Sequence, residues 1–178
     1  MGSDLVKRSK FLSLILRHDP GKANISLDEQ GWVSVDILLK AIKWELFELV
    51  EVVDTNDKKR FEFSENGKKI RASQGHSIDV DLGYETKEPP ELLYHGTSRD
   101  NFKAISDSGL LKMERHDVHM FDNYKQALDV ATGRRRNPAV VTIAAQEMFA
   151  NGYKFKLSTN NVWLTDVVPP RYLRYQSG

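Results

Sequence analysis

The sequence of 178 residues contains no cysteine. This absence excludes disulfide bonds, thiolate nucleophiles and zinc sites built on cysteine, and it fits the reducing cytoplasm. No apolar run approaches the roughly 18 residues that a membrane-spanning helix needs. The N-terminus also lacks the pattern of a signal peptide. We therefore expect a cytoplasmic protein that has no membrane partner and acts as a monomer.

Motifs of several enzyme classes are missing as well. The chain has no glycine-rich phosphate loop, no Gly-x-Ser-x-Gly motif and no pair of acidic residues typical of a glycosidase. Its histidines lack a metal-binding pattern such as His-Glu-x-x-His, and the closest two, His116 and His119, flank a predicted strand. The sequence therefore predicts no metal site.

Neither sign of charge is in excess, since 26 Lys and Arg residues face 25 Asp and Glu residues and the net charge is +1. This balance disfavours a protein that binds nucleic acid through overall positive charge. Any anion-binding site must therefore be local. Hydrophobic residues at 40% and charged residues at 29% are typical of a globular protein.

The first part of the chain predicts three helices and a β-hairpin. Pro20 disfavours helical geometry in the preceding residue, so the first helix should end near Arg17 and His18. Asn66-Gly67, between two alternating segments, is a strong hairpin signal. The predicted elements are a helix over residues 4–16, an extended segment at Trp32-Val33, a helix capped near Ser34, a helix over 44–56 and a hairpin over 60–73. This order is that of a winged helix.

The second part of the chain follows an acidic connection. Residues 75–91 hold five acidic residues against one lysine and include Pro89-Pro90, so we expect an extended crossing between two lobes. The predicted boundaries are 1–78 for the first lobe, 79–91 for the linker and 92–178 for the second lobe. The elements predicted in the second lobe are strands over 92–98, 117–121, 139–145 and 162–168 and helices over 101–109 and 123–133.

Three stretches carry groups suited to phosphate chemistry. They are Arg17-His18, the sequence IRASQGHS at 70–77 and the sequence GRRRNP at 133–138. Arginine binds phosphate oxygens bidentately, and histidine donates or shuttles protons near neutral pH. Considered separately, each stretch is more commonly a solvated surface feature, namely a helix end, a wing tip and a basic loop. The residues alone therefore indicate metal-free phosphate chemistry only weakly.

Taken together, these stretches resemble the RNA 2′-phosphotransferase family, the NAD-dependent enzymes that remove a splice-junction 2′-phosphate from tRNA. The matching segments follow the family's order and cover nearly all of the chain. They are SKFLSLILRHDP, GWVSVDILL, RFEF, IRASQGHS, LYHGTS, VHM, the region from GRRRNP to AVV, and VWLTDVVPPRYL. The resemblance implies an α+β fold in which an N-terminal winged-helix lobe precedes a C-terminal ADP-ribosyltransferase-like lobe of mixed α/β structure.

The resemblance also implies two groups of site residues. The catalytic, phosphate-binding group falls on Arg17, His18, Arg71 and Arg135. The NAD-binding group falls on His95, Gly96, Thr97 and His119, with Gly96 and Thr97 letting the dinucleotide approach. The family's Gly-x-Arg-x-Gly-x-Pro pattern is one residue shorter here, so Arg134 and Arg136 are alternatives to Arg135. Asp117 stands where the family often has a histidine.

The implied reaction has two steps. The RNA 2′-phosphate first attacks the anomeric carbon of the nicotinamide riboside of NAD and expels nicotinamide. The new ribose 2″-hydroxyl then attacks the phosphorus, which releases RNA with a free 2′-hydroxyl and ADP-ribose 1″,2″-cyclic phosphate. Arginines are suited to the negative charge that builds up in the second step. His18 either clamps the phosphate or protonates the departing RNA 2′-oxygen.

Two other functions are open at this point. An ADP-ribosyltransferase that acts on terminal phosphates of RNA or DNA would use the same NAD site. A winged-helix nucleic-acid-binding module would carry out no catalysis. The nearly neutral charge and the YHGTS stretch of the second lobe argue against the module.

Overall fold

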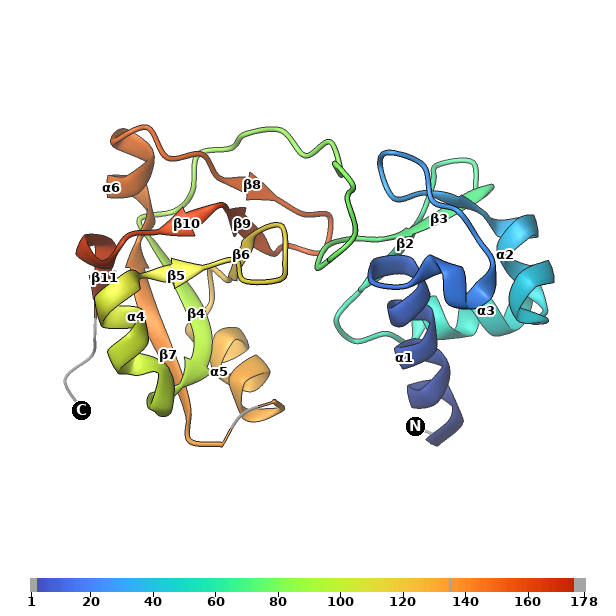
Figure 1. The fold of residues 1–178 in the computed structure, drawn as a ribbon, viewed down its shortest axis with the longest axis horizontal. Coiled ribbons are helices and arrows are strands. Elements are labelled where there is room, and N and C mark those ends of the chain that lie inside the picture. Colours follow the sequence, from blue (N-terminus) through green and yellow to red (C-terminus); the bar gives the residue numbers. More distant parts are fainter. Residues whose placement is uncertain (1–2, 135, 175–178) are drawn as a thin grey trace. The chain divides into compact units, whose positions relative to one another are not determined.

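The computed structural model describes residues 3–134 and 136–174 (Figure 1). The chain divides into two compact units, Met1–Gly83 and Tyr84–Gly178. Both units combine helices with antiparallel strand pairs, so the fold is α+β, as predicted. The longest helix described has 15 residues, and none in the described part of the chain has the length and apolarity needed to cross a bilayer.

The first unit combines helices with a small sheet (Figure 1). The strands of this sheet are antiparallel and follow the order β1-β3-β2. Its elements are α1 (Ser3–Arg17), η1 (Pro20–Ala23), β1 (Val33–Ser34), α2 (Val35–Ile42), α3 (Leu46–Asp54), β2 (Phe61–Phe63) and β3 (Lys69–Ala72). The predicted order of three helices and a hairpin is confirmed, although α3 is shorter than 44–56. Ser34 is the N-cap of α2, but its side chain makes no capping hydrogen bond.

The end of α1 lies where the sequence places it. The backbone N–H groups of His18 and Asp19 both donate to the Leu14 carbonyl, each at 2.9 Å, and the α-helix ends at Arg17. Pro20 has no N–H to continue the helix and instead begins η1, whose N-terminus is capped by the Asp19 side chain. Arg17 and His18 are therefore held at a rigid helix end.

The hairpin sets which residues of β2 and β3 face each other. Gly67 adopts φ +67°, and its N–H donates to the Ser64 carbonyl at 2.8 Å, which closes the turn. The strands then pair residues at equal distances from the Asn66–Gly67 bond. Glu62 consequently lies directly opposite Arg71.

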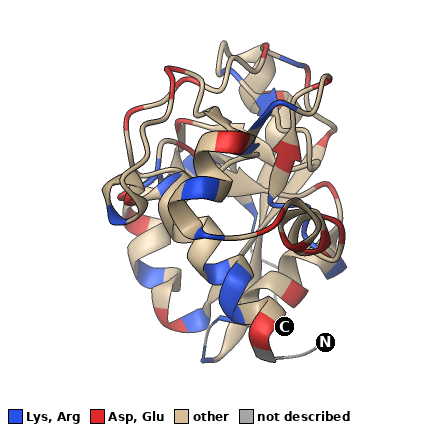
Figure 2. Ribbon diagram, turned by 90° about the vertical axis from the view of Figure 1, so that its right-hand side faces the viewer, with Lys and Arg blue, Asp and Glu red and all other residues tan. Residues whose placement is uncertain are grey.

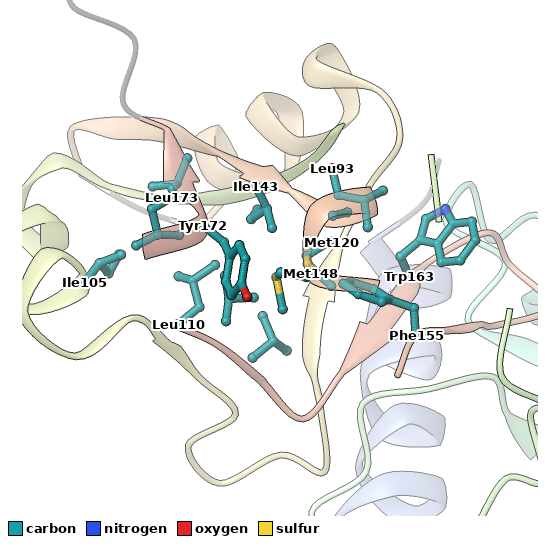
Figure 3. Packing of buried hydrophobic residues seen from close by; sticks show 14 residues of the cluster. Leu93, Ile105, Leu110, Met120, Ile143, Met148, Phe155, Trp163, Tyr172 and Leu173 are labelled. Atoms are coloured by element: carbon teal, nitrogen blue, oxygen red, sulfur yellow. The ribbon is translucent and has the colours of Figure 1, made fainter. Parts of the chain in front are cut away.

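Each unit has its own hydrophobic core. In the first unit, side chains from α1, α2, α3 and β3 meet; the largest fully buried ones are Leu12, Ile15, Leu16, Leu38, Leu49 and Ile70. In the second unit, Leu93 on β4 (Leu92–Ser98) and Ile143 on β7 (Pro138–Ala144) converge with Met148 and Tyr172 from later elements (Figure 3).

The second unit contains strand pairings in the orders β11-β7-β4, β6-β9-β8 and β10-β5. Its helical elements are η2 (Arg99–Asn101), α4 (Phe102–Ser108), α5 (Tyr124–Thr132), α6 (Ala145–Ala150) and η3 (Pro170–Tyr172). Its strands are β4 (Leu92–Ser98), β5 (Leu110–Leu111), β6 (Val118–Met120), β7 (Pro138–Ala144), β8 (Lys156–Leu157), β9 (Trp163–Thr165), β10 (Val167–Val168) and β11 (Leu173–Arg174). β4 and β7 pair along their full length, and α5 packs against both.

The prediction of one continuous strand over 162–168 is wrong. The segment breaks at Asp166, so that β9 pairs with β6 and β8 whereas β10 pairs with β5 in a different sheet. Asp166 forms an ion pair with Lys112 at 2.5 Å. The apolar pattern continues through the break because both halves are buried, but their strand partners differ. The strand predicted over 139–145 ends at Ala144, and α6 begins at Ala145.

Candidate active site

Charged residues of both signs are interspersed along the helices and loops (Figure 2). An anion site must therefore come from particular arginines rather than from a broad basic surface. Arg17 and Arg71, both in the first unit, are buried, with only 7% of each residue exposed. Burying a charge is costly unless it is paired or hydrogen-bonded. Neither arginine is thus a solvated surface group, which was the alternative that the sequence left open.

The segment IRASQGHS wraps around the end of α1. The Ser77 N–H donates to the Arg17 carbonyl at 2.9 Å, and the Ser77 hydroxyl hydrogen-bonds His18 Nδ1 at 2.9 Å. Gly75 adopts φ +86°, a backbone conformation that favours glycine, beside the Arg17 guanidinium. His18 itself is exposed. The segment therefore covers the arginine and orients the imidazole ring of the histidine.

Arg71 lies on β3 and is held on several sides by its own unit. Its Nε donates to Glu62 Oε1 at 2.7 Å, and its Nη1 donates to the carbonyls of Leu82 at 3.0 Å and Gln30 at 3.3 Å. Its guanidinium carbon lies 4.3 Å from the centroid of the Trp32 ring. These contacts fix both the position and the plane of the guanidinium.

In the second unit, His95 on β4 lies against His119 on β6. His95 Nδ1 is 2.8 Å from the His119 carbonyl oxygen, which can only accept, so Nδ1 of His95 carries the hydrogen. Arg115 Nη1 is 2.7 Å from His119 Nδ1, and arginine can only donate, so that nitrogen is the acceptor. With neutral rings, Nε2 is then an acceptor in His95 and a donor in His119.

Gly96 and Thr97, the other two residues expected to bind NAD, have structural roles in β4. A Cβ at Gly96 would overlap the carbonyl oxygen of Ala127 in α5 and lie 3.2 Å from Ala131 Cβ. The close packing of α5 on β4 therefore requires glycine here. Thr97 is buried, and its Oγ1 accepts a hydrogen bond from Asn101 at 3.3 Å.

The arginine triplet belongs to the connection between α5 and β7. Arg135, the residue assigned the catalytic role, lies outside the described residues, whereas Arg134 and Arg136 are exposed. The Arg136 carbonyl accepts a hydrogen bond from the Ser98 hydroxyl at 2.7 Å. The connection is therefore anchored at the end of β4, the strand that carries His95.

The structure thus brings Arg17 together with His18, and His95 together with His119, each within one unit. Glu62, Trp32 and Arg115 contact these residues but were not identified from the sequence. The hairpin register could have revealed Glu62, because residues equidistant from Asn66-Gly67 face each other. Nothing in the pattern pointed to Trp32 or Arg115.

Asp117, which stands where the family often has a histidine, immediately precedes β6. Burial raises the pKa of its carboxyl, although the positive charges of Lys156, His116 and Lys112 act in the opposite direction. Among the described residues, no cluster of three or more His, Cys, Asp or Glu side chains is arranged to hold a metal ion.

The two groups of residues fall within a match to a known family. Residues 3–167 match the model of the RNA 2′-phosphotransferase, Tpt1/KptA family. The chain belongs to this family. A probable RNA 2′-phosphotransferase of Flavobacterium johnsoniae is 47% identical over 174 residues, covering 95% of both chains. Probable RNA 2′-phosphotransferases of Rhodopirellula baltica and Rhizobium johnstonii are 48% and 43% identical, covering 96% of this chain and 96% and 94% of theirs.

Membership of the RNA 2′-phosphotransferase family agrees with the resemblance seen in the sequence motifs. The matched region contains all eight residues that the motifs assign to the site. The relatives span nearly the same length as this chain, so the similarity is not confined to one unit.

Proposed function

We propose that this protein is an NAD-dependent RNA 2′-phosphotransferase, which transfers an internal RNA 2′-phosphate to NAD. The observation that carries the proposal is the family match over residues 3–167, which spans both units. The products are RNA with a 2′-hydroxyl, nicotinamide and ADP-ribose 1″,2″-cyclic phosphate.

In this proposal each unit has one task. Residues 1–78 form a winged-helix lobe that binds the RNA phosphate, 79–91 form the linker, and 92–178 form an ADP-ribosyltransferase-like lobe that binds NAD. The strand order β1-β3-β2, with helices before the hairpin, supports the first assignment. The pairing of β4 with β7 and the placement of His95 within β4 support the second.

NAD is the co-substrate in this proposal, and it binds to the second lobe. His95 and His119 would lie at the NAD site, where the hydrogen bonds at their Nδ1 atoms fix the tautomer and orientation of each neutral ring. Gly96 and Thr97 contribute the strand backbone on which these contacts depend. The attacking group is the RNA 2′-phosphate, which is already an anion. No glutamate is therefore needed to activate it, in contrast to transferases that modify a neutral acceptor.

The first lobe and the arginine triplet serve the second step. Arg17, Arg71 and Arg135 stabilise the charge that accumulates when the ribose 2″-hydroxyl attacks phosphorus, and one such donor typically contributes about 10²–10³-fold in rate. His18 is oriented by Ser77 and either clamps the phosphate or protonates the departing 2′-oxygen.

The proposal is tested by the products formed from NAD and defined oligonucleotides. One oligonucleotide carries an internal 2′-phosphate, a second carries only a terminal phosphate, and a third carries neither. We expect nicotinamide release and ADP-ribose 1″,2″-cyclic phosphate only with the first. ADP-ribose attached to the terminal phosphate would identify the ADP-ribosyltransferase alternative instead. Binding of RNA without NAD consumption would identify a non-catalytic module.

A further inference from the structure

The surroundings of Arg71 contain a second charged residue, Glu62. The ion pair between Arg71 Nε and Glu62 Oε1 is 2.7 Å long, and only 9% and 20% of the two side chains are exposed. The pair is formed across two neighbouring strands, because the hairpin register puts Glu62 on β2 opposite Arg71 on β3. The backbone itself therefore determines that these two side chains meet.

Stability alone is a weak reason for such a pair. Taking both charges out of water costs about as much as their attraction returns, and apolar residues of similar volume often serve a core equally well. A paired and hydrogen-bonded guanidinium nevertheless has one property that an apolar side chain lacks. It remains a cation whose position and plane are fixed before a ligand arrives.

The remaining contacts of Arg71 also restrict the position and the plane of its guanidinium. The ring of Trp32, 4.3 Å from the guanidinium carbon, sets the plane of the group. The Leu82 and Gln30 carbonyls hold Nη1, while Glu62 holds Nε and so prevents rotation within that plane. Of these groups, Glu62 alone contributes a full negative charge.

We propose that Glu62 is a positioning residue, which holds the Arg71 guanidinium in the orientation that the RNA 2′-phosphate requires. This inference rests on the proposed function, because the role of Arg71 in phosphate transfer belongs to it. Glu62 acts through Arg71 and does not itself touch the substrate. Its effect should be largest in the second step, when the phosphate gains charge and the alignment of each donor matters most.

The test compares Glu62→Ala and Glu62→Gln with wild type in single-turnover reactions with NAD and a 2′-phosphorylated oligonucleotide. Nicotinamide release reports the first step, and the decay of 2′-phospho-ADP-ribosylated RNA reports the second. We expect Glu62→Ala to slow the second step by about 10- to 100-fold. The first step and the KM for NAD should change by less than about threefold. Glu62→Gln keeps an acceptor for Arg71 Nε, so its loss should be under about tenfold.

Glu48→Ala is the matched control. Glu48 pairs with Arg8 at 2.8 Å, its side chain is also 20% exposed, and it lies in the same unit at the start of α3. Its other carboxylate oxygen accepts a hydrogen bond from the Glu45 N–H in the capping box of α3, so its removal should destabilise the unit through both the ion pair and the helix cap. The intermediate should nevertheless not accumulate. The proposal would be overturned if Glu48→Ala accumulated the 2′-phospho-ADP-ribosylated RNA at a melting temperature similar to that of Glu62→Ala. General destabilisation of the unit would then explain the slow second step.

A double-mutant cycle separates action through Arg71 from an independent effect. In an Arg71→Ala background, Glu62→Ala should slow the second step by less than about twofold further. If the two substitutions slowed the second step by factors that multiply in the double variant, the proposal would be overturned. A folded Glu62→Ala protein with wild-type kinetics would also overturn it. If Glu62→Ala does not fold, Glu62→Gln decides, and its intermediate must decay more slowly than that of wild type. A wild-type protein that makes no cyclic phosphate would refute the proposed function rather than this inference.

Discussion

Gly96→Ala is expected to destabilise the second unit severely, although the change adds only one methyl group. In an ordinary strand, replacing glycine by alanine raises stability by about 0.4–1 kcal/mol, because the unfolded chain loses freedom. At Gly96 the added Cβ meets α5, where it overlaps the Ala127 carbonyl oxygen and lies 3.2 Å from the carbonyl carbon. Both obstacles are backbone atoms, so no side-chain rotation can relieve the clash.

The size of the effect follows from what has to move. Carbon atoms in contact prefer about 3.5–4.0 Å, so α5 must move away from β4 along the surface where Ala127 and Ala131 are buried. Overpacking of this kind costs about 1–3 kcal/mol, and a clash with backbone belongs at the upper end. For a unit of this size, a loss of about 3 kcal/mol lowers the melting temperature by about 12 °C or more.

The assay is thermal unfolding without NAD, followed by circular dichroism. Gly133→Ala is the control, because Gly133 ends the same helix with φ −71° and an added Cβ would be 3.5 Å from its nearest neighbour, the Asp129 carbonyl oxygen. Its melting temperature should not fall, and a gain of about 0.4–1 kcal/mol would raise it by about 2–8 °C. The reasoning would be refuted if Gly96→Ala melted like the control and lost only NAD binding. Gly96 would then serve the approach of the dinucleotide rather than the packing of α5.

Three further predictions concern other parts of the second unit. Phe155 is fully buried, so Phe155→Ala should cost about 3–5 kcal/mol in chemical denaturation through the cavity it leaves. Burial raises the pKa of Asp117 in the folded protein above its unfolded value. The stability that this group contributes is present below the unfolded pKa and is lost as the pH rises through the folded pKa. Asp117→Asn should therefore raise the melting temperature near neutral pH but not at about pH 3. Arg115→Ala should mix the tautomers of His119, seen as a change in its ¹⁵N chemical shifts, whereas an unchanged spectrum would contradict the role of that hydrogen bond.

Local signals in the sequence were sufficient for the first unit. Pro20 ends α1 through the loss of a donor, and Asn66-Gly67 sets the hairpin, so both features depend on residues that are neighbours in the chain. In the second unit, strands of only two residues, such as β5 and β8, were not predicted, because they are too short to show alternation. β9 and β10 were predicted as one strand, since burial on both sides of Asp166 produces one apolar run.

The sequence by itself determined the end of α1 at Arg17 and, through the resemblance that its motifs carry, the family and the α+β class. Only the tertiary structure decided that Arg17 and Arg71 are buried, that Glu62 and Trp32 hold Arg71, and that His95 meets the carbonyl of His119. The physical reason is the range of each interaction. Helix ends and turns are set within a few residues, whereas burial and hydrogen bonding of a side chain depend on segments that lie far apart in the chain.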